Sequence, residues 1–369
     1  MFYLINYIFV LLCALIFGKH NTRQSRKMFI IVTMLFIMIE TSIRSITVGS
    51  DTYTYVDDFF MMANSSWGDI SDRIIERYVT NTSEMDIGHF VLGKFFSEFS
   101  HSFQLYTFFI TSIFTIPLGM FLYRYTKDFY QLTFAVVFFI ALMLIFPMCG
   151  ARQMQAIGMG ILSFMYVGEG KFLKSLIPIF IGSFIHLSIL LLLPYIVLNF
   201  FCPQLGKKFH LLSFFVIPFV LLFTKRFVMI LASFSGLERY EVYGEGVEAG
   251  GAITFIALIV MMSLFCYIAI PKEYLKSNQR IQKLYMVLPF VSIFGPLINS
   301  GGGMIRISMY YHMYLMVLIP YAIDLFGKDN NRKQMYAFMM FFLMLFSVLG
   351  TPLNYDFFWN DPPATWVSK

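Results

Sequence analysis

Five ionisable residues with the potential to do chemistry lie inside or beside long apolar stretches of the sequence. They are Arg44, Asp51, Arg152, His186 and Arg306. An ionisable group is costly to bury among apolar residues, which makes such residues candidates for function. Arginine stays charged and offers planar, bidentate donors that match phosphate oxygens. Three arginines and a histidine therefore predict a site that recognises a phosphate group.

Each candidate also has a simpler interpretation. Arg44 and Arg306 could extend toward lipid headgroups, His186 could bond between helices, and Asp51 could cap the helix that follows it. Arg152 is harder to explain in this way. It opens a predicted helix, where a positive charge opposes the helix dipole, and this favours an anionic ligand.

Composition predicts the elements that must position these residues. Of 369 residues, 58% are hydrophobic and 13% are charged, whereas soluble domains carry about 25% charged residues. The long apolar stretches do not alternate as barrel strands do. They predict an all-α protein, a polytopic transmembrane bundle of about 10–12 membrane helices. Because several stretches are short, we expect broken helices and a cavity on the outer face. The predicted stretches are 2–17, 28–46, 103–123, 130–148, 153–167, 172–185, 187–201, 209–231, 252–270, 284–300, 305–326 and 334–352.

Charge and motif content exclude several classes of function. The net charge of +6 resides in short loops between apolar stretches and does not indicate nucleic-acid binding. The four cysteines form no CxxC pair and no cluster with histidine, so we expect packed thiols and no metal site. Nucleotide, zinc-hydrolase and serine-hydrolase motifs are absent from the sequence.

Loop charge predicts the orientation in the membrane. The loops at 18–27 and 271–283 are rich in Lys and Arg and are predicted to be cytoplasmic, whereas the loop at 47–87 is acidic. Both termini are then extracytoplasmic, and all five candidates fall on the outer side. This parity requires the apolar run at 172–201 to cross twice, as a hairpin of short helices that breaks near His186.

The chain is predicted to be a single integral membrane domain, residues 1–369. Residues 47–101 form its extracytoplasmic loop. The segment 88–101 is too short to span, and it alternates apolar and polar residues at helical spacing. We expect an amphipathic helix that lies on the outer membrane surface.

Several motifs taken together resemble a known family. The first is Arg44 followed by Val48-Gly49-Ser50-Asp51-Thr52 and Tyr55, with Ser50 in place of the more usual threonine. The later motifs are Arg152-Gln153, Phe184-Ile185-His186-Leu187-Ser188 and Arg306-Ile307-Ser308-Met309-Tyr310-Tyr311. In order and spacing, this set resembles the EpsG-like family of Wzy-type exopolysaccharide and O-antigen polymerases. The resemblance covers roughly residues 40–325, and the last stretch, 327–369, adds little to it.

The resemblance implies an activity and a role for each motif. Such enzymes join oligosaccharide repeat units carried on undecaprenyl pyrophosphate, outside the cytoplasmic membrane. Arg44, Arg152 and Arg306 would bind the pyrophosphate, and His186 or Asp51 would deprotonate the acceptor hydroxyl. Gln153, Tyr55, Thr52 and Tyr310 would contact the remainder of the substrate, and Tyr53, Tyr55 and Trp67 could stack on sugar faces.

The resemblance implies no cofactor and no metal. The implied partners are the lipid-linked oligosaccharide and the bilayer, together with a flippase and a chain-length regulator.

Three other interpretations stay open at the level of sequence. A GT-C-like glycosyltransferase would use a polyprenyl-phosphate sugar and an acidic residue such as Asp51 or the Asp57-Asp58 pair. A lipid-linked-sugar flippase would not be an enzyme. An O-antigen-type ligase or a sugar O-acyltransferase is the third alternative.

Overall fold

The computed structural model describes residues 2–80, 87–224, 226, 229, 252–300, 302–327, 329–350 and 354–362. These residues are predominantly helical, which confirms the predicted all-α class. Their isolated β-bridge joins Arg44 to Phe357. Gly301, residues 81–86 of the acidic loop and the ends of the predicted stretches 209–231 and 334–352 lie outside the described residues.

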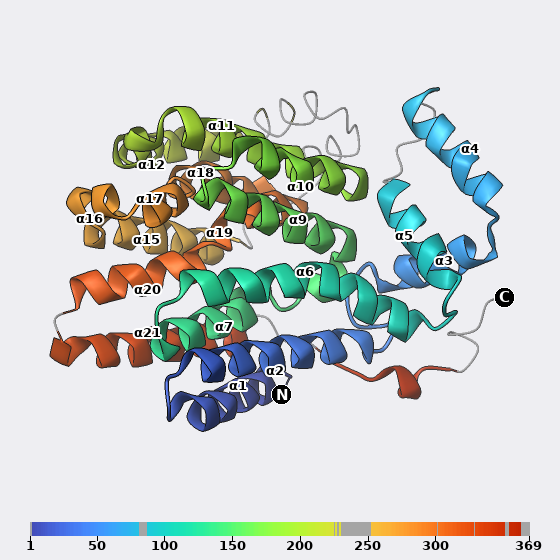
Figure 1. The fold of residues 1–369 in the computed structure, drawn as a ribbon, viewed down its shortest axis with the longest axis horizontal. Helices are drawn as coiled ribbons and strands as arrows, with labels where there is room; N and C mark the ends of the chain where they lie inside the picture. The colour runs from blue at the N-terminus through green and yellow to red at the C-terminus, as the bar shows by residue number, and fades with distance from the viewer. Residues whose placement is uncertain are drawn as a thin grey trace. The chain divides into compact units, whose positions relative to one another are not determined.

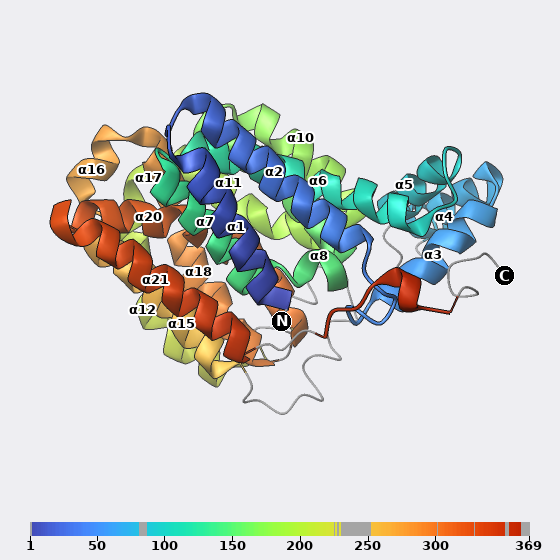
Figure 2. The ribbon, with the colours of Figure 1, turned by 90° about the horizontal axis from the view of Figure 1, so that it is seen from below.

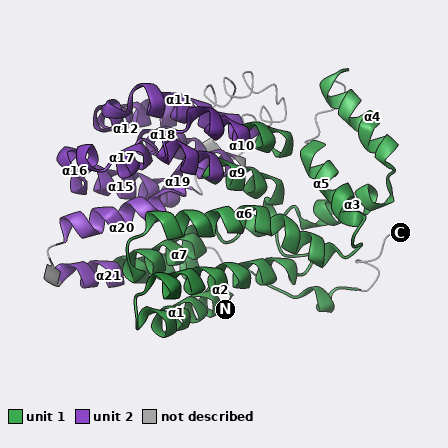
Figure 3. Ribbon diagram, in the orientation of Figure 1, with its two compact units in different colours: residues 1–161, 180–187, 338–369 green, residues 162–179, 188–337 purple. Residues whose placement is uncertain are grey.

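The chain forms two compact units, which Figure 3 distinguishes by colour. Unit 1 comprises residues 1–161, 180–187 and 338–369, and unit 2 comprises residues 162–179 and 188–337. Three α-helices contribute residues to both units: α9 (Ala151–Gly168), α10 (Phe172–Ile185) and α21 (Asp329–Gly350). The 3₁₀ helix η1 (Leu187–Leu192) contributes Leu187 to unit 1 and its other residues to unit 2. The units therefore interleave along the sequence.

Unit 1 holds the elements around the predicted motifs (Figure 1). Besides parts of the three shared helices, these are α1 (Phe2–Gly18), α2 (Arg23–Ser42), α3 (Thr52–Asn64), α4 (Trp67–Tyr78), α5 (Ile87–Ser97), α6 (Phe103–Tyr125), α7 (Phe129–Met143), α8 (Phe146–Cys149) and the 3₁₀ turn η5 (Phe358–Asn360). Helices α1, α2, α6 and α7 pack together through α1–α2, α1–α7, α2–α6 and α6–α7 contacts.

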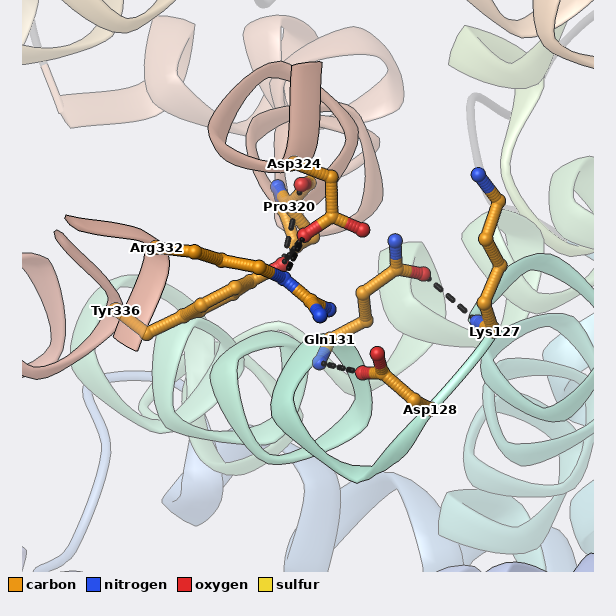
Figure 4. Close-up of polar contacts among 7 residues, drawn as sticks. All are labelled: Lys127, Asp128, Gln131, Pro320, Asp324, Arg332 and Tyr336. Atoms are coloured by element: carbon orange, nitrogen blue, oxygen red, sulfur yellow. Dashed lines mark hydrogen bonds and ion pairs between the residues drawn. The ribbon is translucent and has the colours of Figure 1, made fainter. Parts of the chain in front are cut away.

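Local sequence explains where these helices begin. Thr22 and Ser25 form a capping box at the start of α2, and the Asp128 carboxylate accepts from the Gln131 amide at the start of α7 (Figure 4). Gly119 permits the close packing of α6 on α2, because a Cβ there would lie 2.9 Å from Ile30.

The predicted surface helix exists as α5, but much of it is buried within unit 1. It packs against α3, α4 and α6, and His89, Phe90 and Lys94 are all buried. Phe95 and Phe99 are exposed, at 51% and 74%. The alternation of apolar and polar residues therefore indicated a helix correctly. It did not indicate that His89 faces inward. Contact of α5 with the membrane surface stays a prediction.

Unit 2 contains the later helices. They are η1 (Leu187–Leu192), α11 (Leu193–Phe201), η2 (Pro203–Leu205), α12 (Gly206–Leu222), α15 (Ile253–Ala269), α16 (Lys272–Ser277), α17 (Gln279–Tyr285), α18 (Leu288–Phe294), η4 (Gly295–Ser300), α19 (Gly302–His312) and α20 (Leu315–Phe326). Helices α12, α15, α18 and α19 form its centre through α12–α18, α15–α18 and α18–α19 contacts.

Buried and half-buried polar groups in unit 2 bond to one another. His210 contacts the Tyr285 hydroxyl through Nδ1 and the Ser263 hydroxyl through Nε2, each at 2.8 Å. At the turn from α20 into α21, Arg332 Nε donates to Asp324 at 2.7 Å and the Tyr336 hydroxyl donates to the same oxygen at 2.9 Å (Figure 4). These contacts satisfy polar groups that would be costly to bury alone.

The segment 172–201 folds back on itself, as predicted. Helix α10 ends at Ile185, His186 is non-helical, and η1 begins at Leu187. The Phe172 ring lies 4.9 Å from that of Phe200 and 6.1 Å from that of Phe201, centroid to centroid. One straight helix would separate these rings by about 40 Å. The hairpin geometry is confirmed, and its double crossing of a membrane stays a prediction.

Among the described residues, four helical segments are long and apolar enough to cross a membrane. They are Phe103–Tyr125, Pro203–Leu222, Gln279–Asn299 and Asn331–Gly350. Six shorter apolar helices accompany them: Phe2–Gly18, Phe129–Met143, Phe172–Ile185, Leu187–Phe201, Ile253–Ala269 and Leu315–Phe326. This pattern matches the predicted bundle with short, broken helices.

Candidate functional site

The Arg44–Thr52 motif folds onto the backbone just before α9, within unit 1. Thr52 Oγ1 donates to the Val48 carbonyl at 2.6 Å and lies 3.3 Å from the Met148 carbonyl, which also accepts from Arg44 Nη2 at 3.2 Å. Gly49 has a φ of +93°, and a Cβ there would lie 2.6 Å from the same carbonyl oxygen. The glycine is therefore required both for its backbone conformation and for the close approach.

Arg152 follows this turn as the second residue of α9. Its side chain is half-buried, and its guanidinium carbon lies 5.8 Å from the centroid of the Tyr55 ring on α3. Tyr55 is 3% exposed. A cation over an aromatic face gains electrostatic stabilisation, so Tyr55 fixes the position of the positive charge. The structure thus brings the Arg44–Tyr55 motif and Arg152 together.

His89 is part of this cluster, although its role was not predicted from the sequence. Its buried ring packs edge-on to Tyr55 at 5.8 Å, with Nδ1 3.3 Å from Gln155 Nε2 and Nε2 3.4 Å from the Tyr106 hydroxyl. An amide nitrogen only donates, so His89 Nδ1 accepts and its Nε2–H faces Tyr106. Burial, reinforced by the positive charge of Arg152, lowers the pKa of His89 to about 3. His89 is therefore neutral and unsuited to act as a general base.

Helix α5 also connects this cluster to the break at His186. A Cβ on Gly88 would lie 2.6 Å from the Phe184 carbonyl oxygen, so the first turn of α5 touches the last turn of α10. His186 is half-buried, and its backbone N–H donates to the Gly182 carbonyl at 2.8 Å. Within one turn of α5, Gly88 thus contacts the Phe184–Ser188 motif and His89 contacts Tyr55 of the Arg44 motif.

Arg44 is held in the structure in a way the sequence did not predict. It is 3% exposed, and its two terminal nitrogens donate to the Thr41 and Met148 carbonyls. A side chain committed to two carbonyls fixes the backbone before Arg152. Contact of Arg44 with pyrophosphate stays a prediction, and its burial favours a positioning role.

The C-terminal strap, residues 354–362, is hydrogen-bonded to residues 43–52, which carry the Arg44–Thr52 motif and are called the motif loop below. The Ser45 amide donates to the Asp356 carbonyl at 2.8 Å, and the Phe358 amide donates to the Ile43 carbonyl at 3.0 Å. The Asp361 carboxylate accepts from the Ser45 hydroxyl at 2.6 Å and from the Ile46 amide at 2.9 Å. Residues 354–362, which lie beyond the motifs that carried the resemblance, therefore complete the surroundings of Arg44. Figure 2 shows this segment returning to the elements of unit 1.

The acidic and aromatic candidates in unit 1 divide by exposure. Asp51 is half-buried, accepts from the Ser50 hydroxyl at 2.8 Å and makes no side-chain cap on α3. Tyr53 and Trp67 are 55% and 48% exposed, whereas Tyr55 is buried. Of the three aromatic residues predicted to stack on sugars, Tyr53 and Trp67 therefore have an exposed face.

The remaining candidate on α9 is Gln153, which is buried with 4% of its surface exposed. On α3, Asp58 lies close enough to Arg152 for an electrostatic interaction between the two side chains. Burial raises the pKa of Asp58, and Arg152 opposes that shift.

The other two candidates belong to unit 2. The sequence placed Arg306 in the first turn of its helix. Helix α19 begins at Gly302, so half-buried Arg306 lies in the second turn. The Tyr310 hydroxyl lies 3.0 Å from that of Ser188, and the Tyr311 hydroxyl donates to the Leu191 carbonyl. These contacts anchor α19 one turn beyond Arg306.

This fold and this cluster define a membrane protein of apolar helices, two of which carry a half-buried arginine in their first or second turn. The chain belongs to the EpsG family, whose profile matches residues 26–360. That match includes the motif loop, α9, the hairpin, α19 and most of the strap. Neither the curated proteins nor the solved structures contain a match. Family membership points to polysaccharide biosynthesis and to a polymerase of the glycosyltransferase kind.

Proposed function

We propose that this protein polymerises oligosaccharide repeat units carried on undecaprenyl pyrophosphate, on the extracytoplasmic side of the cell membrane. The observation that carries the proposal is Arg152, which is half-buried at the start of a helix and held over Tyr55. The helix start and the guanidinium present positive charge together, and this suits a pyrophosphate.

In the proposed reaction, the acceptor hydroxyl attacks the anomeric carbon of the growing chain, and the carbon–oxygen bond to the lipid pyrophosphate breaks. Arg152, together with Arg306, stabilises the negative charge on the departing pyrophosphate. Asp51 or His186 takes the proton of the acceptor hydroxyl. Neutral His89 and buried Arg44 act on the site by positioning its side chains, and no metal takes part.

Deletion of the gene, followed by sizing of the lipid-linked glycans, tests the proposal. A polymerase defect leaves single repeat units on the outer leaflet, and the wild-type gene on a plasmid restores the polymer. Absence of repeat units would indicate a glycosyltransferase that builds them, such as a GT-C-like enzyme. Repeat units trapped on the inner leaflet would indicate a flippase, and polymer that is made but not attached would indicate a ligase.

A further inference from the structure

A groove of about 350 Å³ lies between α2 and α6 in unit 1. Its walls are mainly apolar and include Ile31, Leu35 and Met38 of α2 and Ile116 and Met120 of α6. Ile31, Ile116 and Met120 are 46%, 56% and 52% exposed, so the groove is open along one side. The two helices thus form a surface groove that opens outward from unit 1.

The lining indicates a hydrocarbon ligand. The Thr115 hydroxyl, inside the groove, donates to the Thr111 carbonyl at 3.1 Å and has no proton left for a ligand. Lys27 and Tyr123 supply the other polar groups, and both lie at one end of the groove. Methionines have flexible, polarisable side chains that adapt to irregular shapes such as a methyl-branched chain.

The position of the groove relates it to the candidate site. Met38 lies six residues before Arg44, or about 9 Å along the helix axis, and Lys27 lies about 26 Å from Arg44. With the motif at the predicted outer boundary of a hydrocarbon core about 30 Å thick, a groove that runs from about 9 Å to about 26 Å below it would cross the bilayer midplane. A phospholipid acyl chain occupies one leaflet, whereas a long polyprenyl chain reaches past the midplane.

We propose that this groove binds the polyprenyl chain of the lipid-linked substrate, with the pyrophosphate at the outer end of α2. The inference rests on the proposed function, because it needs a polyprenyl carrier at the Arg152 site. The groove holds the chain beside α2 and thereby brings the pyrophosphate to the motif loop that α2 leads into.

The full-length protein in nanodiscs of phosphatidylethanolamine and phosphatidylglycerol provides the test. The probe is undecaprenyl phosphate with a photoreactive diazirine in its chain, and peptide mass spectrometry locates the labelled residues. Labelling is expected on the α2 and α6 residues of the groove and should be removed by unlabelled undecaprenyl phosphate but not by added phospholipid. Ile116→Trp and Met120→Trp, which fill the groove from exposed positions, should each reduce labelling about tenfold.

Ile8→Trp is the matched control, because Ile8 is also exposed, at 51%, but lies on α1 outside the groove. Labelling of this variant should equal that of the wild type. Equal labelling of both groove variants, or competition by phospholipid, would overturn the proposal and leave an ordinary lipid-facing surface. Normal polymer from the groove variants in cells would also count against the groove, while a deletion strain that still polymerises would count against the proposed function alone.

Discussion

The two arginine-bearing helices, α9 in unit 1 and α19 in unit 2, are held in different ways. Arg152 stands in the first turn of α9, and the backbone before it is fixed by Arg44 and Thr52, about 100 residues earlier in the chain. Arg306 stands in the second turn of α19, and the tyrosines that anchor this helix follow it. Unit 1 therefore preorganises the start of its helix, whereas unit 2 anchors the part of its helix beyond the arginine.

The largest expected effect comes from replacing Arg152, whose fork geometry lysine cannot reproduce. Loss of one charge-assisted contact costs on the order of 1.5–3 kcal/mol, about one to two decades in rate. Arg152→Lys should lower polymer by this factor while folded protein in the membrane stays normal. Polymer yield and membrane protein level, measured together, check this.

Arg306→Lys extends the comparison to unit 2 and should also lower polymer without loss of protein. A residue that merely reaches toward lipid headgroups would tolerate lysine, because both side chains extend equally well. Near-normal polymer from both lysine variants would therefore exclude the phosphate site.

The contacts that preorganise unit 1 can be broken at Gly49. Gly49→Ala forces a side chain into a positive-φ conformation and against the Met148 carbonyl, at a cost on the order of 1–3 kcal/mol. We expect a lower melting temperature for the purified protein. Gly350→Ala is the control, since a Cβ there would meet nothing within 4 Å. Equal melting temperatures for the two variants would show that the close approach is not needed.

The strap can be loosened at Asp361. Asp361→Ala removes two hydrogen bonds to the motif loop, which together contribute about 1–2 kcal/mol. Polymer should fall several-fold, with Asp361→Asn retaining part of the activity because its carbonyl oxygen still accepts one bond. Asn354→Ala, at an exposed position of the strap, serves as the control. If the two alanine variants make equal amounts of polymer, the strap does not support the site.

His89 predicts a specific dependence of stability on pH. Its folded-state pKa is below its usual value of about 6.5, so as pH falls below that value the unfolded chain takes up a proton that the folded protein does not. Stability is unaffected above pH 6.5 and falls between about pH 6.5 and 3, by about 2 kcal/mol at pH 5. Melting temperatures at pH 7.5 and pH 5 should differ less for His89→Gln than for the wild type.

Asp58 should change stability with pH in the direction opposite to His89, and it therefore provides a control for this experiment. Because its folded-state pKa is raised, the folded protein binds the proton first as pH falls, and this adds stability. Asp58→Asn should therefore steepen the loss of stability toward pH 5. Identical pH dependence in the wild type and both variants would exclude any contribution from this cluster.

The smallest effect on activity is expected from single-cysteine substitutions that test the orientation of the chain in the membrane. Single cysteines at Ser66, Ser277 and Ser368 should leave polymer unchanged, and a membrane-impermeant reagent should label the first and last only. Ser368 lies outside the described residues. A reporter fused after Lys208 should read as cytoplasmic. Outside labelling at Ser277 would reverse the predicted orientation and remove the argument that all candidates share the outer side.

The sequence predicted the helices well because apolar length and interruption are local properties. The ends of α10 coincide with the predicted 172–185, and the break at His186 followed from charge parity. The convergence of the Arg44 motif with Arg152 was also predicted. Arg306 was misplaced by about one turn, because its helix begins within a glycine run that gives no capping signal.

Three features of the site could not be predicted, since they depend on partners that are distant in the chain. His89 looked like one polar residue of a surface helix, and only its contacts with Tyr55, Tyr106 and Gln155 show that it faces inward. The burial of Arg44 depends on a carbonyl 104 residues away. The strap joins Ile46 to Asp361 across 315 residues, and its sequence carries no local sign of that contact.

The strap also has a consequence for how the protein is made. Ile46 leaves the ribosome long before Asp361, because 315 residues separate them. At about 5–20 residues per second, the motif loop waits roughly 15 to 60 s for the residue that fastens it. By the end of this interval the emerging chain holds every predicted catalytic residue but still lacks the hydrogen bonds from Asp361 to the motif loop. The site would therefore be complete only after Asp361 has been made, and chains terminated before this residue would be inactive.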